Sequence, residues 1–105
     1  MKRRVRLDAA FAAAPLSRMP PESKKRMREA LRSLGDDPSG RARRLDVKEL
    51  DLSGEGPALL RLRLGDWRAV YAVRARDVVV VRIFHRSEGY GWLECFDQAA
   101  RSGDE

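Results

Sequence analysis

Residues 60–92 constrain the fold of this chain most strongly, because apolar and polar residues alternate there as they do in β-strands. We predict a strand at 59–64, a return strand at 67–74 and a third strand at 78–84. Gly65-Asp66 is typical of a two-residue hairpin turn, since glycine takes the positive φ that this turn requires. The run of valines in the third strand indicates that it is central and buried on both faces. The stretch therefore predicts an antiparallel β-meander.

The first twenty residues predict a strand and a helix. Residues 2–7 alternate in polarity, with Val5 and Leu7 on one face of the strand. Asp8 is placed to cap a helix over residues 9–14. Pro15 should end or kink that helix, because proline lacks the N–H that the helix interior needs. The apolar side chains expected to anchor this segment in the core are Phe11, Leu16 and Met19.

A second helix is predicted at residues 22–34, where apolar residues recur at helical spacing on one face. We expect Gly35 to end it, since glycine favours the position after a helix. Residues 39–56 are compatible with a short strand or with an ordered loop. A short helix is predicted at residues 92–100. The apolar stripe of the second helix consists of Met27, Ala30, Leu31 and Leu34.

The length of 105 residues predicts one domain over residues 1–105. The formal net charge of +6 favours polyanionic partners, nucleic acid first, although ordinary surface charge is the alternative interpretation. The single cysteine, Cys95, excludes an internal disulfide, and without a cysteine and histidine cluster we expect no metal or other cofactor. This cysteine content makes cytoplasmic residence the simplest expectation. No apolar stretch approaches the roughly 18 residues of a membrane span, so we expect no membrane partner.

Arginines recur on the strands of the meander. Arg61 and Arg63 share one face of their strand, and Arg68 follows directly across the hairpin turn. Neighbouring guanidinium groups repel one another unless an anion lies among them, and phosphate satisfies them with paired hydrogen bonds. The alternative is a solvated face. His85 and Tyr90, near the end of the third strand, are candidates for proton transfer. The alternative for His85, which is normally the commoner one, is a half-buried ring paired with a backbone group, and the alternative for Tyr90 is packing.

Two segments carry a resemblance to a known family. Residues 61–71, Arg-Leu-Arg-Leu-Gly-Asp-Trp-Arg-Ala-Val-Tyr, and residues 85–90, His-Arg-Ser-Glu-Gly-Tyr, resemble the RelE/ParE superfamily of toxins from bacterial type II toxin–antitoxin systems. The resemblance implies an α+β, RelE-like fold: an N-terminal strand, two helices packed on one face of an antiparallel meander, and a short C-terminal helix. It also implies a cognate antitoxin as partner.

The resemblance implies two alternative activities. RelE-like members are endoribonucleases (mRNA interferases) that cleave mRNA on the ribosome and so inhibit translation. ParE-like members inhibit DNA gyrase without nuclease activity. The first activity is favoured here, with ribosome and mRNA as partners and no small-molecule substrate.

The family's site residues carry over by position. Arg68 matches the arginine that stabilises the scissile phosphate, Arg61 a basic position on the preceding strand, and Tyr90 a general base. His85 resembles an acid or base of some members, whereas Leu59 and Phe84 stand where the pattern has a lysine and an arginine. The residues expected to support phosphate binding or the proton transfers are Arg63, Arg82, Arg86 and Glu88.

Overall fold

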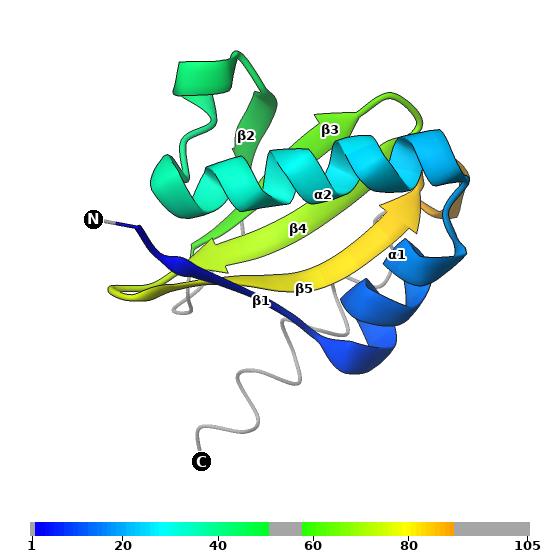
Figure 1. Cartoon of the computed structure of the whole chain (residues 1–105), viewed down its shortest axis with the longest axis horizontal. Helices are drawn as coiled ribbons and strands as arrows, with labels where there is room; N and C mark the ends of the chain where they lie inside the picture. Colours follow the sequence, from blue (N-terminus) through cyan, green and yellow to red (C-terminus); the bar gives the residue numbers. More distant parts are fainter. Residues whose placement is uncertain (1, 51–57, 90–105) are drawn as a thin grey trace.

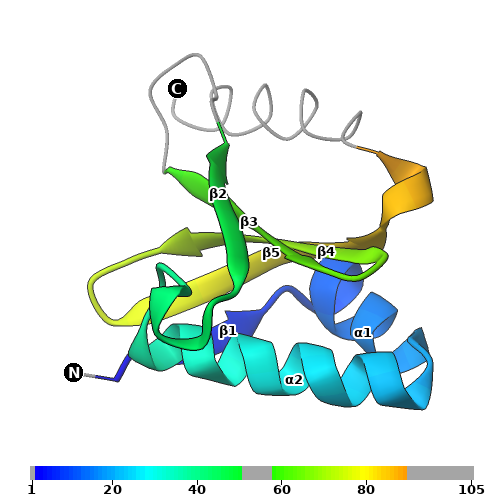
Figure 2. The same cartoon turned by 90° about the horizontal axis from the view of Figure 1, so that it is seen from above.

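One open, mixed β-sheet with helices on a single face makes up the fold of the computed structural model, which describes residues 2–50 and 58–89 (Figure 1). Figure 2 shows both α-helices on the same side of the sheet. The expected α+β architecture is therefore confirmed, while the helix expected at 92–100 lies outside the described residues. The strands are β1 (Arg4–Leu7), β2 (Asp46–Leu50), β3 (Leu59–Leu64), β4 (Trp67–Val73) and β5 (Asp77–His85). The helical elements are η1 (Ala9–Ala13), α1 (Ala14–Arg18), α2 (Pro21–Asp36), η2 (Arg41–Arg43) and η3 (Arg86–Glu88).

The strand order is β1-β5-β4-β3-β2, which makes β3, β4 and β5 the predicted meander. Gly65 has φ 61° in the β3–β4 turn, as the hairpin prediction required. β1 pairs in parallel with β5 and forms one edge of the sheet, while β2 forms the other edge. Of the two alternatives predicted for residues 39–56, a short strand or an ordered loop, β2 shows that part of the segment is a strand. No helix in the described part of the chain is long and apolar enough to cross a membrane.

The segment around Pro15 differs from the expectation. The carboxylate of Asp8 accepts a hydrogen bond from the Phe11 N–H at 2.7 Å, so the predicted cap is confirmed. The following turn is a π-helix, and α1 begins at Ala14 with proline in its first turn, where a missing N–H costs nothing. The helix therefore changes register near Pro15 and continues to Arg18.

Phe11 was wrongly expected in the core. It is 53% exposed, whereas its neighbour Ala12 is fully buried. The π-turn places Ala12 toward the core, and the Phe11 ring instead lies 5.1 Å from the guanidinium carbon of Arg82. Leu16 and Met19 are buried as expected.

Gly35 does not end the second helix, which continues to Asp36. Its role is to allow close approach between α2 and the chain entering β1. The Arg3 N–H donates to the Gly35 carbonyl at 2.8 Å, and a Cβ atom on Gly35 would lie 2.6 Å from the Arg3 carbonyl oxygen. The glycine is thus required by packing between two elements and not by helix termination.

Two apolar clusters lie on opposite faces of the sheet. The larger one joins the predicted stripe of α2 to helix-facing residues of the strands, among them Leu62, Ala69 and Tyr71. Burial raises the pKa of the Tyr71 hydroxyl well above its ordinary value, and the neutral hydroxyl donates to the Pro38 carbonyl at 2.6 Å. The smaller cluster occupies the other face and consists of Leu59, Val70, Ala72 and Phe84.

Candidate functional site

Arginines gather on the face of the sheet opposite the helices. Residues that pair across neighbouring strands share a face, so the register determines which side chains lie together. Arg63 pairs with Arg68, and Val70 pairs with both Arg61 on β3 and Arg82 on β5. The sheet thus brings together four of the predicted phosphate-binding residues. We call this surface the arginine face: Arg61, Arg63, Arg68 and Arg82.

Arg61 is largely enclosed by its neighbours. Its side chain is 16% exposed, and its Nη2 donates to the Asp46 carboxylate on β2 at 3.0 Å. Its Nε is buried and has no hydrogen-bond partner among the described residues. A buried N–H without a partner is costly, so this donor is a feature that an oxyanion would satisfy.

Arg68 is held by the hairpin turn itself. Its Nη1 donates to the carbonyls of Gly65 at 2.7 Å and Trp67 at 3.0 Å. A single guanidinium carries five N–H donors, so these two bonds orient the group and leave further donors for an anion. Arg63, directly across from it on β3, is exposed.

Two residues on β2 extend this surface and were not predicted as part of it. Lys48 pairs with Arg61 across the β2–β3 ladder, and Asp46 pairs with Arg63 while binding the Arg61 guanidinium. Lys48 therefore adds a cation to the row, and Asp46 partly neutralises it. These two residues could have been found from the strand alternative predicted for residues 39–56, because the side chains of such a strand would line up with those of β3.

His85 lies on the other face of the sheet. It pairs with Trp67, which packs against the helix-side cluster, and the two rings meet edge to face at 5.2 Å between centroids. Its Nδ1 accepts the Ser87 N–H at 3.2 Å and lies 2.9 Å from the Ser87 hydroxyl oxygen. Because Nδ1 accepts a hydrogen bond, the neutral ring carries its proton on Nε2. The structure therefore does not bring His85 to the arginine face.

Glu88 and Arg86 hold the turn that follows β5. The Glu88 carboxylate accepts the His85 backbone N–H at 2.8 Å, which completes a capping box with the imidazole. Arg86 Nε lies 3.3 Å from the Asp66 carboxylate, and the Arg86 N–H donates to the Asp66 carbonyl at 2.8 Å. Both side chains thus have structural contacts with the β3–β4 turn or with β5.

Tyr90, the predicted general base, lies outside the described residues, one position after Gly89. Among the described residues there is no cluster of three or more histidine, cysteine or carboxylate side chains that would hold a metal ion. The guanidinium groups of the arginine face can bind anions and stabilise negative charge.

Comparison with known proteins points to toxins of toxin–antitoxin pairs. The family described as "ParE toxin of type II toxin-antitoxin system" matches residues 7–90. No curated protein sequence matches the chain.

Three solved structures are similar to this chain. The archaeal RelE–RelB complex from Pyrococcus horikoshii contains a chain with 26% identity and a TM-score of 0.69, covering 85% of this chain and all of its own. The RelBE2 complex of Mycobacterium tuberculosis gives 24% identity and a TM-score of 0.64, with 83% and 94% covered. The RelB–RelE complex of Methanococcus jannaschii gives 21% identity and 0.64, with 83% and 96% covered. The last two show similarity of fold alone.

Proposed function

This chain belongs to the RelE/ParE superfamily of type II toxin–antitoxin toxins, and we propose that it is a ribosome-dependent endoribonuclease that cleaves mRNA. The observation that carries the proposal is the buried Nε of Arg61, which has no partner in the described part of the chain, beside the cross-strand pair Arg63–Arg68. A phosphate oxygen would satisfy that donor, and its charge would be shared with neighbouring guanidinium groups. Ribosomes and mRNA would place this activity in the cytoplasm.

The reaction follows from the chemistry of RNA. The 2′-oxygen attacks the adjacent phosphorus, a base removes the 2′ proton, and the 5′-oxygen leaves with a proton from an acid. The products are a 2′,3′-cyclic phosphate and a free 5′-hydroxyl. Arg61 and Arg68 are proposed to stabilise the negative charge that develops on the phosphate oxygens, with Arg63 and Arg82 binding the neighbouring backbone.

The proton transfers are assigned to the end of β5. Tyr90 is proposed as the base because it matches the position of the family's general base, and a phenol within reach of the 2′-hydroxyl could take up its proton. His85 is proposed as a positioning residue, since its Nδ1 already accepts the Ser87 N–H and its ring lies against Trp67. Glu88 and Arg86 would support the same turn.

A second candidate is gyrase inhibition without nuclease activity. Two observations favour it: the matching family is described as ParE toxin, and His85 lies across the sheet from the arginines. In that case the arginine face would bind a protein or DNA surface and no proton transfer would be needed. A partner antitoxin is expected for either activity.

Mapping of mRNA 5′ ends after induced expression tests the proposal. Cleavage is expected within translated messages, with growth arrest, and Arg68→Ala and Tyr90→Phe should each relieve both. Arrest with intact mRNA would overturn the nuclease proposal, and induction of the DNA-damage response under the same conditions would select the gyrase alternative.

A further inference from the structure

An exposed aromatic ring borders the arginine face. Phe11 of η1 is 53% exposed, whereas Phe84 of β5 is 1% exposed and belongs to the smaller apolar cluster. The ring of Phe11 therefore contributes little to the core. Its backbone is nevertheless fixed, because the Phe11 N–H donates to the Asp8 carboxylate at 2.7 Å. Phe11 thus presents an aromatic surface to solvent at a defined place in the fold.

The place of Phe11 follows from the different lengths of β1 and β5. β1 pairs with β5 only as far as Val80, whose carbonyl also accepts the Asp8 N–H at 2.9 Å. η1 begins directly after this point and contacts β5. Two residues further along β5, the guanidinium carbon of Arg82 lies 5.1 Å from the centre of the Phe11 ring. Because Arg82 belongs to the arginine face, Phe11 lies at the edge of that face, beyond β5.

One row of side chains crosses the sheet and ends at this ring. Cross-strand pairs join Lys48 on β2 to Arg61 on β3, Arg61 to Val70 on β4, and Val70 to Arg82 on β5. The Phe11 ring, in contact with Arg82, is the last member of the row. Surfaces that bind single-stranded nucleic acid combine these same two features, because cations follow the phosphate backbone and aromatic rings stack with bases. The row therefore has the composition of a single-strand binding surface.

We propose that single-stranded RNA crosses the strands along this row and that one of its bases stacks on Phe11. Lys48, Arg61 and Arg82 would contact the phosphate backbone. Phe11 lies three strand spacings from β3, about 14 Å, so the stacked base would belong to a nucleotide away from the phosphate at Arg61. Every base has a π-face, so this contact would hold the RNA without selecting its sequence. The proposal rests on the proposed function in taking mRNA as the ligand, and it does not depend on cleavage.

The simpler alternative is that Phe11 only positions the Arg82 guanidinium by a cation–π contact. The two roles differ in their response to salt. Each phosphate contact made by a cation releases counterions and contributes about 0.7 to the slope of log affinity against log salt for a single strand. Stacking of a base on a ring makes no such contribution. Loss of a stacking ring should therefore weaken binding at every salt concentration and leave the slope unchanged.

Fluorescence anisotropy at several salt concentrations tests the proposal on the full chain made by cell-free synthesis. The probe is a short 2′-O-methyl oligoribonucleotide, which cannot be cleaved because its 2′-oxygens are blocked. Phe11→Ala should weaken binding by about 5- to 150-fold, which corresponds to one lost base–aromatic stack, with an unchanged salt slope. Phe11→Tyr keeps the ring and should bind within about threefold of the parent. Arg82→Gln should instead reduce the slope by about 0.7.

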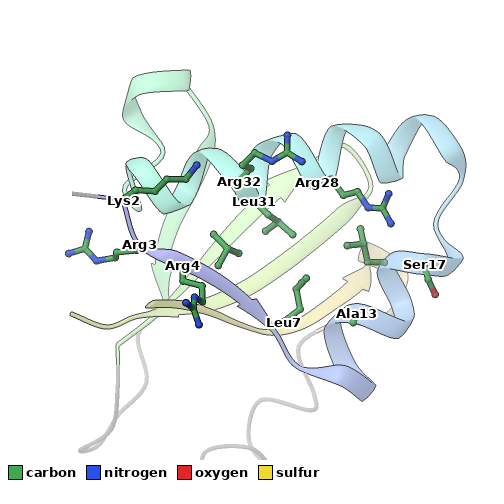
Figure 3. A pocket seen from close by; sticks show the side chains of 11 residues that line it. Lys2, Arg3, Arg4, Leu7, Ala13, Ser17, Arg28, Leu31 and Arg32 are labelled. Atoms are coloured by element: carbon green, nitrogen blue, oxygen red, sulfur yellow. The ribbon is translucent and has the colours of Figure 1, made fainter. Parts of the chain in front are cut away.

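Leu7→Ala is the matched control, because Leu7 is the other large apolar residue that is exposed within residues 2–50 and 58–89. Figure 3 shows Leu7 pointing into a pocket between β1 and the α-helices, away from the arginine face. Its truncation should change the affinity for the probe by less than about twofold.

Three results would overturn the proposal. The parent does not bind the probe, or Phe11→Ala binds as tightly as the parent, which would leave the ring to a protein contact, or Phe11→Ala lowers the salt slope as Arg82→Gln does. Because the probe cannot be cut, the nuclease proposal is decided separately by mapping mRNA 5′ ends, and either proposal can fail without the other.

Discussion

Replacing Arg61 with methionine should separate stability from activity. The substitution removes an ion pair with Asp46, whose side chain is 56% exposed, so the loss is about 0–1 kcal/mol after solvent screening. It also removes a buried Nε that finds no partner in residues 2–50 and 58–89, and the desolvation of such a group costs about 1–3 kcal/mol. Methionine retains most of the apolar stem. The free energy of unfolding is therefore expected to stay equal to that of the parent or to rise by up to about 3 kcal/mol.

Activity should respond in the opposite direction. If Arg61 binds a phosphate oxygen in the transition state, its loss is comparable to the loss of one oxyanion donor, about 10²–10³-fold in rate. The assay is cleavage of a defined message in a purified translation system, with thermal unfolding of the same preparations. A stable variant that cleaves within about threefold of the parent would refute the role of Arg61.

Asp46→Ala is the matched control, because it breaks the same ion pair from the other side. It should cost no more than about 1 kcal/mol of stability and leave the Arg61 guanidinium free for phosphate. Cleavage is expected to be retained or raised. If Asp46→Ala and Arg61→Met lose activity equally, the ion pair serves only to hold β2 against β3.

Two further substitutions test the packing of α2 and the role of His85. Gly35→Ala should lower the free energy of unfolding by about 1–2 kcal/mol, because the new methyl group would meet the Arg3 carbonyl, and this outweighs the better helix propensity of alanine. An unchanged thermal unfolding temperature would contradict this explanation. His85→Ala should reduce cleavage while His85→Asn restores it, since asparagine can still accept the Ser87 N–H; equal loss in both variants would identify proton transfer by the ring as the function of His85.

The meander and α2 were predictable because each has a simple local cause. Alternation defined β3 and β4, the turn glycine joined them, and the i, i+3, i+4, i+7 stripe defined the buried face of α2. The prediction that Gly35 ends the helix was wrong, because the glycine is required by a contact with a part of the chain that is distant in sequence. Nothing within the helix indicates that the chain preceding β1 passes within contact distance of it. The π-turn before Pro15 also depends on packing, because it directs Ala12 and not Phe11 into the core.

Within a single strand or hairpin, the sequence predicted which side chains of the candidate site share a face, but it did not predict how β5 aligns with β4. Period-two alternation placed Arg61 and Arg63 on one face, and the tight turn placed Arg68 beside them. The face on which His85 lies could not be predicted from the sequence. The pairing of β4 with β5 shifts by one residue at Val70 and Tyr71, so β5 contains one residue more than simple alternation assumes. Sequence alone does not show such a bulge, and an extra residue changes the face of every side chain after it.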